Sequence, residues 1–305
     1  MDQIRDSHLE GDLHLPLCVA CGSQYSDEPK EATSNSCKIC DDPRQFVPPG
    51  GQQWTTLASI QRTHQNKWER DPKNPNLWSI WSEPKFAIGQ RAMLLETANG
   101  NVLWDLIALL NNSTIEFIKS RGGLKAMVIS HPHYYTTYCV WAKAFNCPVY
   151  ISSDDQRWLC RKDSKTDLTR FIDGPAPAEK TVLPGVTAIK TGGHFPGSLV
   201  LHWEHQLFIA DTIMTVPSAY TPHPRPPDQT SFAFQWSIPN MIPLAPDDIM
   251  TIWRAVRGYD FDTTYGAFNG MTVRDLDMKQ RILMSMKTQV RSMGWEKHEL
   301  LDETV

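Results

Sequence analysis

The chain has 305 residues, of which 41% are hydrophobic and 21% are charged. These are ordinary globular proportions, so general disorder is excluded, and a chain of this length can bury a substantial core. The formal net charge of -4 and the pI near 6.2 provide no basic field for a phosphate backbone, so no nucleic-acid partner is expected. Because no apolar stretch approaches the roughly 18 residues of a membrane helix, no membrane partner is expected either.

The N-terminus lacks the basic start and apolar run of a secretory signal. We therefore expect a cytoplasmic location, with the nucleus as an alternative, where thiols stay reduced. Under these conditions the seven cysteines are predicted to be metal ligands or buried thiols, not disulfides.

Four cysteines form two Cys-x-x-Cys pairs, Cys18 with Cys21 and Cys37 with Cys40. This spacing is typical of a zinc ribbon, in which two tight turns supply four thiolates and leave no open position. It predicts a structural zinc in a zinc-ribbon-like segment over residues 1–60, followed by one domain over 61–305. Unrelated thiols and a redox role are the weaker alternatives. The other three cysteines, Cys139, Cys147 and Cys160, are predicted to be buried thiols.

Strands and helices alternate through the body of the chain. Strands at 92–96 and 101–106 are predicted to form a hairpin, followed by a helix whose capping box begins at Ser113 and then by a strand at 124–130. Further elements are expected in the following order: a helix at 138–145, strands at 148–152, 186–190, 198–203 and 206–210, a helix at 247–256, a strand at 261–265 and a helix at 273–293. Leu276, Ile282, Leu283, Met286 and Val290 are predicted to form the buried stripe of the last helix.

Eight prolines interrupt residues 215–247, and the aromatic residues Phe232, Phe234 and Trp236 lie among them. We expect this segment to be an ordered loop over the site.

Polar residues follow three of these strands: His131 and His133 after the first, His194 after the second and Asp211 after the third. Side chains alternate along an extended chain, so a His-x-His pair is expected to point both rings to the same side. Three imidazoles and a carboxylate gathered at strand ends suit zinc or another divalent transition metal.

At these residues the chain resembles the metallo-β-lactamase family. Members carry a His-x-His-x-Asp-His motif, a further His in a Gly-rich loop, an Asp after the next hairpin and a last His near the end. The chain has Gly192 to Ser198 as Gly-Gly-His-x-x-Gly-Ser and Ala210 to Thr212 as Ala-Asp-Thr, which is similar to the large hydrolase branch. The resemblance implies an α/β fold: an αββα sandwich of two mixed sheets flanked by helices, preceded here by the four-Cys segment.

The chain departs from the family at the second metal position. Tyr135 and Thr136 stand where the motif has Asp-His, and only Asn269 is available where the last His belongs. His131, His133, His194 and Asp211 match the first metal position, so a mononuclear site is expected.

The resemblance also implies roles for individual residues. Asp211 is a candidate ligand or proton acceptor, and Tyr135 is a candidate hydrogen-bond donor to a developing oxyanion. Asp105 either supports the histidines from below or simply ends a strand. His202 and His205 are not expected to be ligands, whereas His223 is a candidate replacement ligand or base.

We therefore expect a metal-dependent hydrolase that uses a metal-activated water on an ester, lactone, lactam or thioester of a small, partly apolar molecule. It would hold one structural and one catalytic zinc, with iron or manganese as alternatives at the catalytic position. A catalytically degenerate metal- or metabolite-binding protein of the same fold is the alternative, and redox chemistry at an iron site is a third hypothesis. The sequence indicates neither the substrate nor the oligomeric state.

Overall fold

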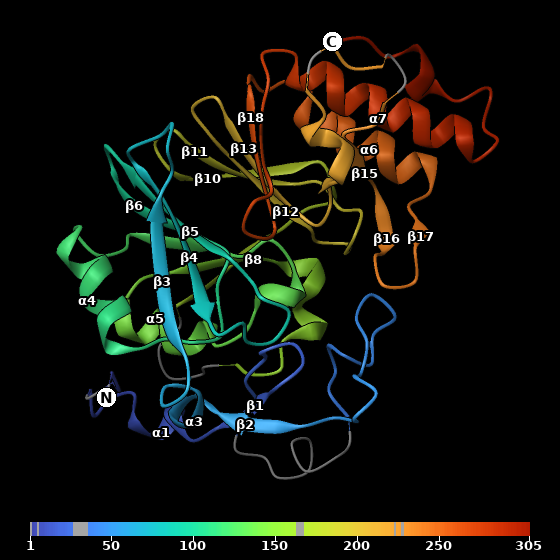
Figure 1. The fold of residues 1–305 in the computed structure, drawn as a ribbon. Helices are drawn as coiled ribbons and strands as arrows, with labels where there is room; N and C mark the ends of the chain where they lie inside the picture. The colour runs from blue at the N-terminus through green and yellow to red at the C-terminus, as the bar shows by residue number, and fades with distance from the viewer. Residues whose placement is uncertain (1, 5, 27–35, 163–167, 223, 227–228) are drawn as a thin grey trace. The chain divides into compact units, whose positions relative to one another are not determined.

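The computed structural model describes residues 2–4, 6–26, 36–162, 168–222, 224–226 and 229–305. The chain divides into two compact units, shown in Figure 1. Unit 1 comprises Met1–Ile151 and Asp155–Phe171, and unit 2 comprises Ser152–Asp154 and Ile172–Val305. Among the described residues, no helix is both long and apolar enough to cross a membrane.

A seven-stranded mixed sheet forms the frame of unit 1, in the order β3-β4-β5-β6-β7-β8-β9. Its strands are β3 (Gln65–Arg70), β4 (Leu77–Glu83), β5 (Ala92–Thr97), β6 (Gly100–Trp104), β7 (Ala126–Val128), β8 (Val149–Ser152) and β9 (Thr169–Ile172). Strands β3 to β6 are antiparallel, whereas β6, β7 and β8 run parallel. All three residues of β7 are buried, as expected for a central parallel strand.

Two helices make the connections between the parallel strands of unit 1, namely α4 (Asn112–Ser120) and α5 (Tyr138–Phe145), and Figure 1 shows both beside the sheet. The α5 helix has the predicted bounds and ends at Asn146, whose φ of 46° lies in the left-handed region that Asn tolerates. The predicted cap of α4 is wrong. Asn111 caps the helix by accepting from the Thr114 N–H, while Ser113 donates its hydroxyl to Asp2.

The N-terminal part of unit 1 holds short elements around a two-stranded pairing. These elements are α1 (Glu10–Leu13), β1 (Pro16–Cys18), β2 (Trp54–Thr56) and α3 (Leu57–Ile60). Two 3-10 turns follow later in the chain, η1 (Pro132–Tyr134) and η2 (Ser153–Trp158). Asp12 forms ion pairs with Lys143 and Arg161, at 2.8 Å and 2.5 Å. This segment is therefore tied to the later part of unit 1 by contacts that bridge more than 100 positions of sequence.

A six-stranded mixed sheet forms the frame of unit 2, in the order β10-β11-β12-β13-β18-β19. Its strands are β10 (Ala178–Leu183), β11 (Val186–Lys190), β12 (Leu199–Trp203), β13 (Gln206–Ala210), β18 (Thr263–Gly266) and β19 (Thr272–Arg274). Only the β13–β18 pair within this sheet is parallel. The two mixed sheets with helices that the sequence predicts are thus both present, one in each unit.

Two helices, α6 (Pro246–Val256) and α7 (Met278–Ser292), pack against each other in unit 2 (Figure 1). Pro246 occupies the first turn of α6, and Asp247 and Asp248 follow where the helix dipole favours negative charge. Where the structure describes it, the proline-rich segment forms short ordered elements: β14 (Met214–Thr215), η3 (Pro217–Tyr220), β15 (Phe232–Ala233), β16 (Gln235–Ser237) and β17 (Ile242–Pro243). A last 3-10 turn, η4 (Glu299–Asp302), lies near the C-terminus.

The start of α7 differs from the prediction. Residues 272–274 form β19 instead, and the helix begins only at Met278. Leu276, predicted to be buried, is 92% exposed, whereas the other four members of the predicted stripe are buried. The strand takes these first residues because Val273 pairs with Thr264 of β18 and is itself buried.

We predict that Leu283→Ala lowers the free energy of unfolding by about 2–5 kcal/mol, because Leu283 is fully packed in the unit 2 core. Leu276→Ala is the matched control, and its exposed side chain should change stability by less than about 0.5 kcal/mol. Urea unfolding of both variants measures the difference. Equal losses would contradict this register of α7.

Candidate functional site

The four-Cys group, Cys18, Cys21, Cys37 and Cys40, has the geometry of a closed metal site. All four side chains are buried, and each offers one sulfur within 4.8 Å of the others. The Sγ atoms of Cys18 and Cys40 are 3.7 Å apart, and those of Cys21 and Cys37 are 3.6 Å apart. Tetrahedral zinc with bonds of ~2.3 Å places its sulfurs about 3.8 Å apart, so the donor set fits.

Polar neighbours of the four-Cys group favour the thiolate form of its sulfurs. The Gln52 side-chain amide donates to Cys18 Sγ at 3.0 Å, and the Tyr25 hydroxyl donates to Cys37 Sγ at 3.5 Å. Hydrogen bonds from the other cysteines lower the pKa of the Cys18 thiol, whereas burial raises the pKa of Cys21. Donors aimed at sulfur are the outer partners that a metal-bound thiolate requires.

None of the seven cysteines, all of which the structure describes, forms a disulfide. Cys139 and Cys147 are buried, while Cys160 is half-buried. Burial raises the pKa of the Cys147 thiol to about 12, so it stays protonated near neutral pH.

His131 is held by a chain of hydrogen bonds that begins at Asp105. This buried carboxylate accepts from the Ser130 N–H at 2.7 Å and from the Ser130 hydroxyl at 2.9 Å. The Ser130 oxygen in turn lies 2.8 Å from His131 Nδ1. Because the hydroxyl proton goes to Asp105, this oxygen accepts from Nδ1–H, which leaves the lone pair of the ring on Nε2.

His133 lies beside His131, with ring centroids 4.9 Å apart and ligand atoms within 4.8 Å. The pair converges as expected, but not along an extended strand. His131 has extended backbone, and Pro132 then begins the 3-10 turn η1, which contains His133. Proline favours the first position of such a turn because its φ is fixed and it lacks an N–H.

His194 and Asp211 are brought together within unit 2, with ligand atoms within 4.8 Å of each other. Thr212 joins their two loops: its hydroxyl donates to the Gly192 carbonyl at 2.7 Å and accepts from the His194 N–H at 3.3 Å. Gly193 has a φ of 93°, and a Cβ there would lie 2.8 Å from the Thr212 hydroxyl. Only glycine fits this approach.

The ring of His194 is oriented by the proline-rich segment. Its Nδ1 lies 3.1 Å from the carbonyl oxygen of Gln235 in β16. A carbonyl can only accept, so Nδ1 carries the proton and Nε2 carries the lone pair. His194 is fully buried, and Asp211 is 4% exposed.

Tyr135, which stands in place of the family's Asp, is buried in unit 1. Its hydroxyl donates to the Asp155 carbonyl at 3.4 Å. Burial raises the pKa of this phenol well above its ordinary value, and Asp155 adds to the shift, so the group stays neutral.

Tyr265, which ends the strand expected at 261–265 and precedes Asn269, and the other histidines lie in other surroundings. The ring of Tyr265 stacks on Phe208, with centroids 5.0 Å apart. His202 and His205 contact Asp260, through its carbonyl at 2.9 Å and its carboxylate at 3.1 Å, respectively. His223 lies outside the described residues.

Residue patterns in the sequence did not single out the supporting groups Ser130, Thr212 and Gln235. The signals available were a hydroxyl residue directly before His-x-His and another directly after Asp211. Gln235 had no local signal, because it is 41 positions from His194.

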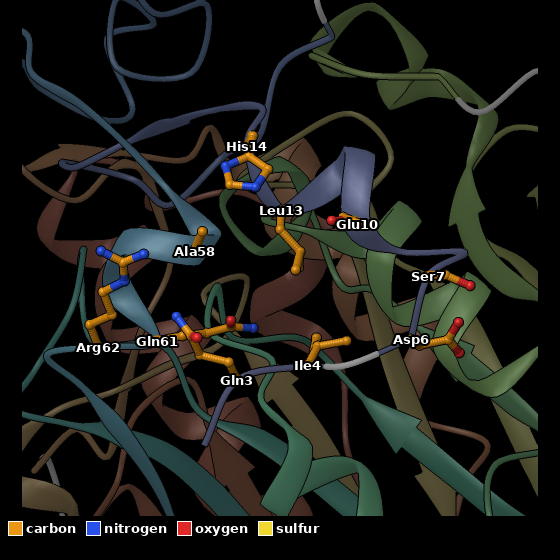
Figure 2. A pocket seen from close by; sticks show the side chains of 10 residues that line it. All are labelled: Gln3, Ile4, Asp6, Ser7, Glu10, Leu13, His14, Ala58, Gln61 and Arg62. Carbon is orange, nitrogen blue, oxygen red and sulfur yellow. The ribbon is translucent and has the colours of Figure 1, made fainter. Parts of the chain in front are cut away.

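A pocket of about 300 Å³ lies in the N-terminal part of unit 1 and contains none of the candidate ligands. Figure 2 shows its lining, with apolar Ile4 and Leu13 among polar side chains that include Asp6, Glu10 and Arg62.

A comparison with curated proteins identifies a relative. YmaE of Bacillus subtilis (strain 168), an uncharacterized protein, is 35% identical over 269 residues, which are 86% of this chain and 91% of YmaE. The chain belongs to the YmaE family. No family model matches the sequence.

Solved structures identify the fold. A metallo-β-lactamase from Hirschia baltica covers 72% of this chain and 97% of its own, with 12% identity and a TM-score of 0.50. VMB-1 covers 74% and 98%, with 13% identity and a TM-score of 0.53. FIM-1 of Pseudomonas aeruginosa, in its mono-zinc form, covers 76% and 97%, with 12% identity and a TM-score of 0.51. The chain has the metallo-β-lactamase fold, and the predicted fold class is confirmed.

We predict that Ser130→Ala weakens metal binding at His131 by about 10- to 100-fold, because the ring loses the partner that fixes its Nδ1 proton. Competition with a chromogenic chelator measures the affinity. Thr114→Val is the control, since it also removes a fully buried hydroxyl of unit 1 but one that contacts Asn66 and Asn111. Equal affinities in the two variants would contradict the role of Ser130.

Proposed function

We propose that this protein is a metal-dependent hydrolase of a small, partly apolar ester, lactone, lactam or thioester. One ion would be held by His131, His133, His194 and Asp211, and a separate structural zinc by the four-Cys group. The observation that carries the proposal is the hydrogen bond at one nitrogen of each of two histidine rings. In His131 and His194, Nδ1 donates to an acceptor, so that Nε2 is left as a ligand atom.

The ligand atoms of the two groups suit two kinds of metal site: an open site at the His/Asp residues and a closed site at the four-Cys group. Ligand atoms of His131 and His133 lie together in unit 1 and those of His194 and Asp211 in unit 2, and three imidazoles and one carboxylate are a ligand set for zinc, iron or manganese. Four thiolates complete a tetrahedron without a substrate position, so the four-Cys group would be structural. We keep the division of the chain into a zinc-ribbon-like segment at 1–60 and a domain at 61–305 as part of this proposal.

A divalent ion bound by such residues lowers the pKa of water and polarises a substrate oxygen. The chain itself would supply the rest. Asp211, buried next to His194, would hold the proton released at the site, and its attachment through Thr212 would keep its carboxylate in place. Tyr135 keeps its phenolic proton near neutral pH and would donate a hydrogen bond to a developing oxyanion in place of the one it donates to the Asp155 carbonyl.

This chain has other residues where the metallo-β-lactamase family has the ligands of the second metal, and this difference supports a mononuclear site. Tyr135 and Thr136 provide no carboxylate or imidazole, and the described turn between β18 and β19 offers Asn269. The same substitutions also favour the alternative, a protein of this fold that binds a metal or metabolite without turnover. The mono-zinc form of FIM-1 is a precedent for a single ion in the fold.

We predict two metal ions per chain in the intact protein and one in His194→Ala, with hydrolytic activity lost. Elemental analysis counts the ions, and a panel of chromogenic esters, lactones, thioesters and cephalosporins measures turnover. Activity should disappear on chelation and return with zinc.

His202→Ala is the matched control, since His202 contacts the Asp260 carbonyl away from the candidate ligands. It should keep both ions and full activity. Unchanged metal content in His194→Ala would refute the ligand assignment, and two bound ions without turnover on any substrate class would favour the binding protein.

A further inference from the structure

Gln90 joins the four-Cys group to the loop that carries His133. Its side-chain Nε2 donates to the Cys21 carbonyl at 2.8 Å and to the His133 carbonyl at 3.2 Å. Gln90 is 3% exposed and precedes β5. A primary amide has two N–H donors, and both are used on carbonyls that belong to candidate ligand residues.

A second link runs between the same two segments. The backbone N–H of Gln24 donates to the Thr136 carbonyl at 3.1 Å. Residues 21–24 therefore contact the loop at 133–136 at both of its ends. This is the loop whose family counterpart supplies the second metal position.

The approach of these segments depends on Gly22, which lies between the two links. Its φ is 79°, and a Cβ there would lie 2.9 Å from the Ala108 Cβ and 3.7 Å from Gln90 Nε2. The turn itself is set by the four-Cys group, since the Gly22 N–H donates to the Cys18 carbonyl at 2.9 Å. The position of the Cys21 carbonyl thus follows from the turn that brings Cys18 and Cys21 together, in which the Cys21 N–H donates to Cys18 Sγ at 3.5 Å.

We propose that Gln90 is a positioning residue for His133, bracing its backbone against the four-Cys segment. The proposal rests on the proposed function for the metal-binding role of His133. His131 is fixed through its ring by Ser130, whereas His133 is fixed through its carbonyl by Gln90, so the two ligands have independent supports. The N-terminal zinc-ribbon-like segment then helps to position His133 as a metal ligand.

The test compares Gln90→Met with Gln61→Met in the full-length chain. Methionine keeps the length of the side chain but donates no hydrogen bond. Gln61 is the matched control because it is 4% exposed, lies in unit 1 and donates from Nε2 to a single carbonyl, that of Leu110, at 2.7 Å. Cobalt(II) is the probe, since four-thiolate and His/Asp coordination give different absorption bands.

In Gln90→Met we expect cobalt binding at the His/Asp group to weaken by about 10- to 100-fold, while the thiolate bands keep their full intensity. Hydrogen exchange, followed by mass spectrometry, should show faster uptake in residues 131–137 and in the contacting residues 21–24, and no change elsewhere. Gln61→Met should match the unmodified chain in both measurements. Gln90→Asn, which keeps the amide but reaches one methylene less, should fall between them and carries the test if Gln90→Met does not fold.

Equal cobalt affinity and equal deuterium uptake at 131–137 in the Gln90 and Gln61 variants would overturn the proposal that Gln90 positions His133. The two proposals fail separately. If the unmodified chain binds cobalt only at the four thiolates, the proposed hydrolase site is refuted, and the uptake at 131–137 still decides whether Gln90 holds this loop.

Discussion

The candidate chemistry depends on one kind of interaction, a hydrogen bond that fixes the proton of an imidazole on Nδ1. A neutral imidazole has one lone pair, so an acceptor at Nδ1 decides that Nε2 can bind a metal. Ser130, backed by the buried Asp105, serves His131, and the Gln235 carbonyl serves His194. Asp105 and Ser130 are buried with the ring of His131, where they are protected from competing water, and His194 is itself fully buried although Gln235 is half-buried.

The rings of His131 in unit 1 and His194 in unit 2 are held by different kinds of contact. In unit 1 a short-range contact between adjacent residues, Ser130 and His131, is anchored on a strand-end carboxylate. In unit 2 the support comes from a distant segment, β16. Phe234, the residue before β16, is attached to Gln289 of α7: its N–H donates to Gln289 Oε1, and Gln289 Nε2 donates to its carbonyl. The proline-rich segment is ordered where it is described because its aromatic residues Phe232 and Phe234 enter the unit 2 core.

Much of the fold could be predicted from the sequence, because many of its elements carry local signals. The α5 helix and the β12–β13 hairpin were predicted within a residue, since apolar runs mark their extent. Strands β3 and β4 were missed because they carry charged residues and half-buried tryptophans, which give no clear alternation. The start of α7 was misplaced because pairing with β18 overrides the helical pattern around Val273.

The candidate ligands were equally accessible to sequence analysis, because each follows a strand and matches a motif. Their supports were not. The Cys21–Gln90–His133 connection joins residues 43 and 69 positions apart, and no periodicity encodes such a contact. The sequence shows glycine at positions 22 and 193, but the atoms that exclude a side chain there are contributed by Ala108 and Thr212.

The attachment of Asp211 to His194 through Thr212 has a thermodynamic consequence. His131 and His133 are adjacent within unit 1, and His194 and Asp211 are adjacent within unit 2, so in the proposed metal site each pair would act as a bidentate chelator. Once one donor of a pair has captured an ion, the second bond closes at high effective concentration, without the entropy loss of recruiting a separate side chain. Most of the ordering cost of coordination is therefore met when each unit folds, long before an ion arrives.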